Sequence, residues 1–158
     1  MSLSHFTFSG TTYEQGLAHG EILKKSIINN IEIYVNRFEN EAGIGKNELL
    51  ENSGIYLNIL REQSPEYVNG MNGISESSNL ELLEIAMLNL RYELLYHALG
   101  RKLQSDAVDG CTSFAILQEE VENNHLLMGQ NWDWIPDVEC VLTTSIDADR
   151  IKRMAFTE

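Results

Sequence analysis

The sequence predicts an α+β fold in which helices come first and an antiparallel sheet follows. From about Thr11 to Gly100, apolar residues recur at helical spacing. After Gly110 the apolar period changes to two, which is typical of strands. We therefore divide the 158-residue chain into a helical segment, residues 1–110, and a strand segment, residues 111–158.

The helical segment opens with a capping signal, since the Thr11 hydroxyl and the Glu14 carboxylate are three residues apart. Apolar residues recur at helical spacing from Leu17 to Phe38, and we expect Gly43-Ile44-Gly45 to break this first helix. Gly16 and Gly20, four residues apart, lie on one helix face and would let another element approach closely. Further helices are predicted over residues 46–62, from Pro65 to a glycine- and serine-rich stop at 70–79, and from a Ser78 or Asn79 cap to Leu99.

The last predicted helix is broadly apolar, which indicates burial on much of its circumference. Asn89, Arg91 and Glu93 interrupt that texture, either as a polar cluster near a site or as a solvated strip with one salt bridge. In the strand segment we expect a hairpin from residues 111–117 and 126–132, then strands at 138–146 and from 150 to 157.

Charge and composition exclude several classes of function. The formal net charge is −13, with 24 acidic residues against 11 Lys and Arg, so nucleic acid and anionic membranes are poor partners. No apolar run approaches the roughly 20 residues that span a bilayer, and the N-terminus does not read as a secretory signal, so we expect a cytoplasmic protein. The four histidines are scattered, and we predict no metal site.

The chemically distinctive residue is Cys111, which follows Gly110 where a loop becomes a strand. Its thiol could attack the Gly110 carbonyl, and hydrolysis of the resulting thioester would leave a cysteine with a free α-amine. That amine has a pKa of about 7.7–8.0 and can act as the general base of its own thiol. The other interpretation is a small buried core cysteine.

The second strand of the hairpin ends in a polar and aromatic run, GQNWDW at 129–134. The hairpin would bring it within range of Cys111, where Asp133 could orient the new amine and Asn131 could hold a substrate carbonyl. Trp134 and Phe114 are candidate substrate-binding residues. Alternatively, the tryptophans fill the core and Asp133 is a turn residue.

These motifs resemble the isopenicillin N acyltransferase family (acyl-coenzyme A:6-aminopenicillanic acid acyltransferases) of N-terminal-nucleophile hydrolases. The resemblance runs nearly end to end, through FSGTTYEQG at 8–16 with HG at 19–20, PEY at 65–67 with GI at 73–74, EIAMLNLR at 84–91, DGCTS at 109–113 and GQNWD at 129–133. Related bile-salt hydrolases and penicillin V acylases carry an arginine where this chain has Gln130, which favours the acyltransferase branch.

The resemblance implies a zymogen that cuts itself between Gly110 and Cys111 and an αββα sandwich of two antiparallel sheets. Residues 1–110 would be the α chain, and 111–158 the first strands of the nucleophile domain. The reaction would be acyl transfer or amide hydrolysis through an acyl-thioester on Cys111, with Asp133 beside it. The substrate would be a small acyl amide or acyl-coenzyme A, no cofactor is implied, and a homodimer is allowed.

The family continues well beyond residue 158, so we expect the chain to be truncated at its C-terminus. A different class of function is then open: a non-catalytic helical module for interaction or oligomerisation that keeps family residues without turnover. A third option is a cysteine peptidase with His125 as base.

Overall fold

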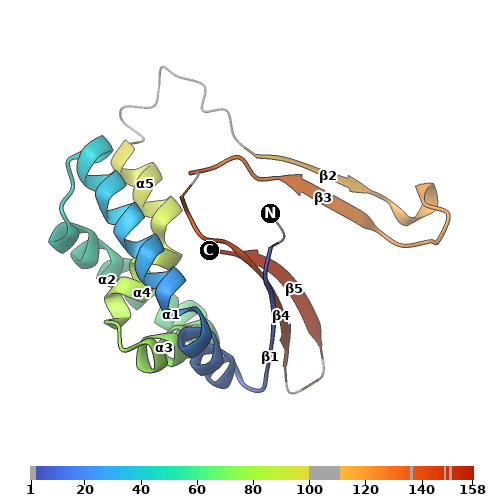
Figure 1. Cartoon of the computed structure of the whole chain (residues 1–158), viewed down its shortest axis with the longest axis horizontal. Coiled ribbons are helices and arrows are strands. Elements are labelled where there is room, and N and C mark those ends of the chain that lie inside the picture. The colour runs from blue at the N-terminus through green and yellow to red at the C-terminus, as the bar shows by residue number, and fades with distance from the viewer. Residues whose placement is uncertain (1–2, 100–110, 136, 148, 150) are drawn as a thin grey trace. The chain divides into compact units, whose positions relative to one another are not determined.

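The computed structural model describes residues 3–99, 111–135, 137–147, 149 and 151–158 and confirms the α+β class. The chain forms two compact units, one made of Met1–Arg101 with Val138–Glu158 and the other of Lys102–Asp137. Figure 1 shows their elements. The first unit contains β1 (His5–Ser9), α1 (Thr12–Arg37), a π-helical turn (Phe38–Ala42), α2 (Lys46–Gln63), α3 (Pro65–Ser78), α4 (Leu82–Asn89), α5 (Arg91–Leu99), β4 (Val141–Ile146) and β5 (Lys152–Thr157). The second contains β2 (Thr112–Ile116), a 3₁₀ turn (Gln118–Glu120) and β3 (Leu127–Asn131).

The start of α1 confirms the predicted capping box. The Thr11 hydroxyl oxygen accepts the backbone N–H of Glu14 at 3.3 Å, and the Glu14 carboxylate accepts the N–H of Thr11 at 2.7 Å. This backbone hydrogen bond, with a second from the Thr11 hydroxyl, lowers the pKa of Glu14. Two amide groups that the helix cannot pair internally are thereby satisfied.

Helices α1 and α3 cross at the closest approach that the backbone permits, as the spacing of Gly16 and Gly20 predicted. A Cβ atom on Gly16 would lie 2.2 Å from the carbonyl oxygen of Gly70, and one on Gly20 would lie 2.5 Å from that of Ile74. Such distances are far inside van der Waals contact. Glycine is therefore required on α1 for the two helices to pack as they do.

Two helix boundaries differ from the prediction. Helix α3 continues through both its glycines to Ser78, because those glycines face α1 instead of ending the helix, and Asn79 ends it in the left-handed region with φ 56°. The long helix expected up to Leu99 is two helices, α4 and α5, with Leu90 between them at φ −100° and ψ 10°. The cap of α4 is Glu81, and not Ser78 or Asn79.

Helix α4 is buried around its circumference, which confirms the prediction from its apolar texture. Ile85, Ala86, Met87 and Leu88 are consecutive and all buried, so no side of the helix at this level faces solvent. The largest fully buried apolar side chains come from helices α1 to α4 and the turn after α1: Tyr34, Phe38, Leu49, Leu57, Met71, Ile85 and Met87.

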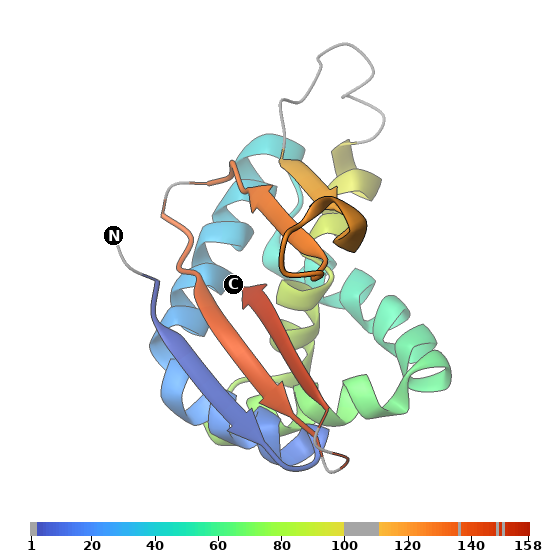
Figure 2. The ribbon, with the colours of Figure 1, turned by 90° about the vertical axis from the view of Figure 1, so that its right-hand side faces the viewer.

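The sheet of the first unit has the order β1-β4-β5. Strands β4 and β5 are antiparallel, as expected, whereas β1 was not predicted and pairs with β4 in parallel, with His5 opposite Leu142. Helices cover one face of this sheet (Figure 2). The first unit is therefore a helix layer on a mixed sheet.

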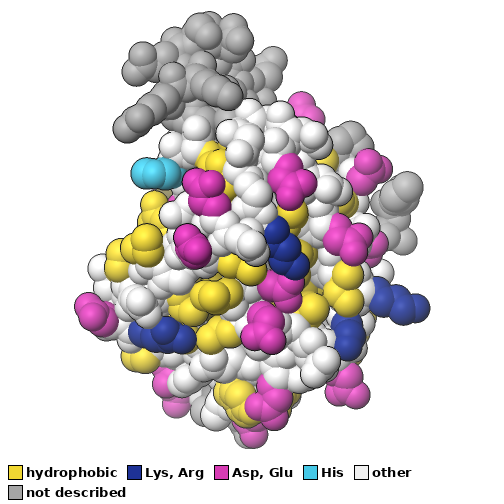
Figure 3. Space-filling model, turned by 90° about the vertical axis from the view of Figure 1, so that its left-hand side faces the viewer, with side chains coloured by type: hydrophobic (Ala, Val, Ile, Leu, Met, Phe, Trp, Pro, Cys, Tyr) yellow, Lys and Arg dark blue, Asp and Glu magenta, His cyan; other side chains and the backbone are white. Residues whose placement is uncertain are grey.

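The outer face of the helix layer is strongly acidic. In Figure 3, Asp and Glu side chains outnumber Lys and Arg, and hydrophobic side chains lie singly or in small groups among them. Ile22, Ile55 and Ile59 are the larger aliphatic side chains exposed on α1 and α2. Within the part of the chain that is described, every helix falls short of the length or apolarity needed to span a bilayer.

Candidate functional site

The second unit is built on the hairpin that the sequence predicted. Strands β2 and β3 are antiparallel, with Thr112 opposite Asn131 and Ile116 opposite Leu127. This register brings the start of β2 and the end of β3 to the same end of the hairpin. Directly opposed residues in an antiparallel pair have Cα atoms about 4.5–5.5 Å apart.

The three candidate catalytic residues all belong to that end of the hairpin. Cys111 is a free, exposed cysteine immediately before β2, Asn131 is the last residue of β3, and Asp133 follows two residues later and is exposed. Gly110, the residue on the other side of the proposed scissile bond, lies outside the described residues. The register thus keeps Cys111 within a few residues of both candidate partners across the strand pair.

Strand alternation divides the hairpin residues between two faces. The ring of Phe114 lies across Gly129, where a Cβ atom would be 2.4 Å from the ring carbons. Thr112 and Asn131 share that face, since they are two residues away along their strands. Ser113 and its partner Gln130 lie on the other face. Phe114 is 55% exposed, and Trp134 is half-buried.

The parity of the strands could have been read from the sequence, but the residue pairs could not. Had the register been known, Gln130 would have been considered beside Asn131, because the two point to opposite faces of β3. The sequence reasoning used Gln130 only as the position that separates this chain from the arginine-bearing hydrolases.

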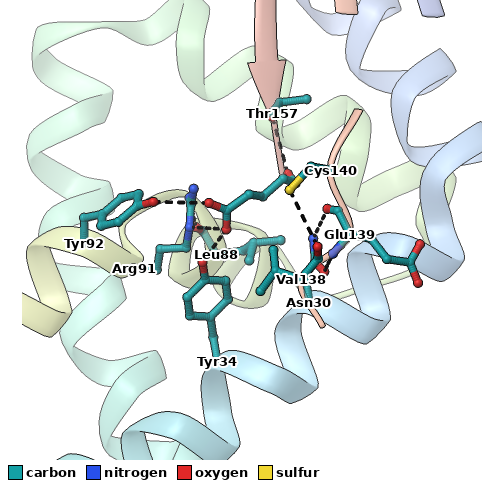
Figure 4. Close-up of polar contacts among 10 residues, drawn as sticks. Asn30, Tyr34, Leu88, Arg91, Tyr92, Val138, Glu139, Cys140 and Thr157 are labelled. Atoms are coloured by element: carbon teal, nitrogen blue, oxygen red, sulfur yellow. Dashed lines mark hydrogen bonds and ion pairs between the residues drawn. The ribbon is translucent and has the colours of Figure 1, made fainter. Parts of the chain in front are cut away.

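The first unit contains a buried charged cluster around Arg91, a residue for which the sequence allowed two interpretations (Figure 4). The Nε atom of Arg91 lies 2.8 Å from Oε2 of Glu158, with side chains only 16% and 3% exposed. The hydroxyl of Tyr92 donates to Oε1 of Glu158 at 3.2 Å, and that of Tyr34 donates to Oε2. Both tyrosine rings also lie against the guanidinium, with centroids 4.5 Å and 5.4 Å from its central carbon. Arg91 is thus part of a buried ion pair, and not of a solvated strip.

Asn30 fixes the chain that leads into β4. Its side chain is fully buried, donates to the carbonyl of Glu139 at 2.8 Å and accepts the Glu139 N–H at 2.9 Å (Figure 4). A single asparagine on α1 therefore pairs with both backbone groups of one residue beside the sheet.

Burial and the charges of Glu158 and Arg91 set the reactivity of the second cysteine, Cys140. Burial and, to a smaller extent, the charge of Glu158 raise the pKa of the Cys140 thiol to about 11 against the opposing charge of Arg91. For Arg91 itself, burial lowers the pKa, but the hydrogen bond and charge of Glu158 outweigh it and the net direction is upward. Cys140 is therefore protonated at neutral pH and a poor nucleophile, because the thiolate is the reactive form.

Comparison with known proteins identifies an acyltransferase as a relative of this chain. The chain is 29% identical over 130 residues to the acyl-coenzyme A:6-aminopenicillanic-acid-acyltransferase 40 kDa form of Emericella nidulans. The aligned residues make up 82% of this chain and 34% of the relative. No protein-family model matches the sequence. The similarity relates most of this chain to that acyltransferase. The chain spans about a third of the length of the curated relative it matches.

Proposed function

We propose that this chain belongs to an acyltransferase or amide hydrolase whose nucleophile is the thiol of Cys111. The observation that carries the proposal is the exposed, free Cys111 directly before β2, at the hairpin end where β3 delivers Asn131 and Asp133. The similarity to an acyltransferase over 82% of the chain supports the same reaction class. The contrast with the half-buried, protonated Cys140 supports the choice of thiol.

The first proposed step is self-cleavage. The Sγ atom of Cys111 attacks the carbonyl carbon of Gly110, the C–N bond of the peptide breaks, and the nitrogen takes up the proton. The product is a thioester between the Gly110 acyl group and Sγ. Water hydrolyses that thioester, which leaves a Gly110 carboxylate and a Cys111 with both a thiol and an α-amine.

The mature residue then needs no histidine as base. Its α-amine, with a pKa of about 7.7–8.0, accepts the thiol proton as Sγ attacks the acyl carbon of the substrate. The leaving group departs protonated, and an amine acceptor or water takes the acyl group from sulfur. In this scheme Asp133 accepts a hydrogen bond from the α-amine and orients it, while Asn131 donates its amide N–H to the substrate carbonyl oxygen.

Trp134 and Phe114 are the proposed contacts for the acyl group. Both carry large apolar surface, and Phe114, in the middle of β2, has 55% of its surface exposed and available to a ligand. An acyl amide or acyl-coenzyme A is the proposed substrate class.

The test is the intact mass of the protein expressed from its gene. Self-cleavage predicts two fragments that divide between residues 110 and 111, and Cys111→Ala should remain a single chain. Cys140→Ala is the matched control, because it removes the other thiol and should still cleave. A catalytically active protein that runs as one uncut chain would refute the mechanism.

A further inference from the structure

The hairpin of the second unit presents two faces of different chemistry. One face carries the ring of Phe114, which lies across Gly129. On the other face Ser113 lies directly opposite Gln130. Side chains that oppose each other in this way have Cβ atoms about 4.5–5.5 Å apart, so the two polar groups are neighbours. The aromatic ring and the Ser113–Gln130 pair therefore lie on opposite sides of the same two strands.

The side chain of Cys111 belongs to the face of the Ser113–Gln130 pair. Cys111 immediately precedes Thr112, the first residue of β2, and its backbone is not in the left-handed region. Strand alternation continued by one residue turns its Sγ atom away from the face of Thr112 and toward that of Ser113. Gln130 is then its diagonal neighbour on β3, and diagonal neighbours lie about 7–8 Å apart, within reach of a long side chain. The Gln130 amide can therefore approach a group bound to Sγ.

Both members of the pair are available to a ligand. Ser113 and Gln130 are exposed, and among the residues that the structure describes neither side chain has a hydrogen-bond partner. The Gln130 amide has an oxygen that accepts and an NH₂ group that donates, and the Ser113 hydroxyl can do either. The next pair on this face is Ala115 opposite Met128, which adds no charge. This face therefore suits an uncharged group that forms hydrogen bonds.

Acyl transfer needs a place for the acceptor as well as for the acyl group. The carbonyl carbon of a thioester is planar, so a nucleophile must approach it from a side that the acyl chain leaves open. With Phe114 as the acyl contact, the acyl chain occupies one face of the hairpin and the acceptor approaches from the other. An amine attacks only in its neutral form, which needs a hydrogen-bond acceptor to orient it and no counter-ion.

We propose that the Ser113–Gln130 pair binds a neutral primary amine as the acceptor of the acyl group. This inference rests on the proposed acyl-thioester at Cys111. The amine nitrogen forms a bond to the acyl carbon, the C–S bond breaks, and the nitrogen gives up one proton, which the departing sulfur takes up. The products are an amide and the free thiol. During the attack the Gln130 oxygen accepts an N–H of the amine, so that the nitrogen lone pair faces the acyl carbon.

The experiment mixes the protein expressed from its gene with hexanoyl-coenzyme A and glycinamide at pH 8. Mass spectrometry follows the hexanoyl adduct on Cys111 and the ratio of the two products, N-hexanoylglycinamide and hexanoate. This ratio isolates the acceptor step, because both products come from the same acyl-enzyme and a general loss of structure lowers both. We expect the amide product to increase with glycinamide concentration and to saturate, as binding at a site requires.

Variants of Gln130 test the pair. Gln130→Met keeps the length of the side chain without its hydrogen bonds and should lower the ratio of amide to hexanoate about threefold to tenfold. Gln130→Glu keeps an accepting oxygen and should retain most of the wild-type ratio. Gln118→Met is the matched control, because Gln118 is an exposed glutamine that follows β2 at the other end of the hairpin, and it should leave the ratio unchanged.

The outcomes separate this inference from the function on which it rests. If the adduct forms on Cys111 but Gln130→Met leaves the ratio unchanged, the acceptor site is wrong and the nucleophile stands. The same holds if the wild type gives hexanoate alone. If no adduct forms on Cys111, the proposed function fails and the acceptor site fails with it.

Discussion

The crossing of α1 and α3 makes a quantitative prediction for a single methyl group. In Gly73→Ala the new Cβ would lie 2.3 Å from the carbonyl oxygen of Tyr13 and 2.8 Å from the backbone nitrogen of Leu17. Both neighbours are backbone atoms of a helix, so neither can rotate away. Gly54→Ala on α2 is the control, because there the nearest atom is a side-chain carbon of Leu83 at 3.7 Å, an ordinary contact.

The size of the effect follows from two opposing terms. Replacing a helical glycine by alanine gains about 1 kcal/mol in helix propensity. Overpacking of this kind typically costs about 1–3 kcal/mol, and here the upper end applies because the Cβ···O distance must lengthen from 2.3 to at least 3.0 Å by moving whole helices. We expect Gly73→Ala to lose about 1–2 kcal/mol of unfolding free energy, and Gly54→Ala to gain about 0.5–1 kcal/mol.

Urea unfolding followed by circular dichroism at 222 nm measures both changes. With an unchanged slope in denaturant, the midpoint should fall for Gly73→Ala and rise for Gly54→Ala. If Gly73→Ala were as stable as the wild type, the two helices could not be in backbone contact, and the packing argument would fail.

Three further predictions concern the charged and titratable groups. Arg91→Ala leaves the carboxylate of Glu158 buried without its counter-ion, and should cost about 3–5 kcal/mol in urea unfolding; a loss below about 1 kcal/mol would mean that the pair is solvated. Iodoacetamide at pH 8 should modify exposed Cys111 well before Cys140, whose thiol pKa is raised to about 11. Peptide mass spectrometry measures the two rates of modification, and equal rates would contradict the difference in reactivity. Burial lowers the pKa of His19 from 6.5, so the unfolded chain binds a proton at His19 more readily and the unfolding free energy should fall as the pH drops below 6.5. In His19→Gln the contribution of His19 to the loss of stability between pH 7 and 5.5 should vanish, and a loss identical to that of the wild type would exclude His19 as its source.

Local signals explain which parts of the fold could be predicted. The capping box at Thr11 and Glu14 depends on residues three apart, and the hairpin depends on two short alternating runs. The tight crossing at Gly16 and Gly20 was also foreseeable, because spacing by four puts both on one helix face. In each case the signal comes from residues that are close together in the sequence.

The errors arose where tertiary packing overrides a local signal. Gly70 and Gly73 indicate a helix end by propensity, yet α3 runs through both. At Gly73 the backbone of α1 occupies the space that a side chain would need, whereas a Cβ atom on Gly70 would lie 3.5 Å from its nearest neighbour, the carbonyl oxygen of Thr12. Leu90 carries no helix-breaking signal, although the chain leaves helical geometry there before Arg91 enters its ion pair with Glu158.

The candidate site was predictable as a set of residues, but its geometry was not. Cys111 and Asn131 follow from motif and hairpin, whereas the division of Asn131 and Gln130 between opposite faces needs the register. Arg91 was noticed as an interruption of an apolar helix. Its partner Glu158 is 67 residues away, and no spacing rule joins two such positions.

The pairing of β1 with β4 shows how a contact between distant segments determines the surroundings of a side chain on a helix. The entropic cost of loop closure grows only slowly with loop length, so pairing His5 with Leu142 costs little more free energy than pairing with a nearer strand would. No sequence signal in either segment identifies its partner. The parallel pairing places Phe8, only 5% exposed, against the ring of His19 on α1. Phe8 and His19 both line a cavity of about 460 Å³ in the first unit, and burial lowers the pKa of His19. The strand that the sequence did not predict therefore supplies the aromatic ring that stacks on His19, and it contributes to the burial that lowers the His19 pKa.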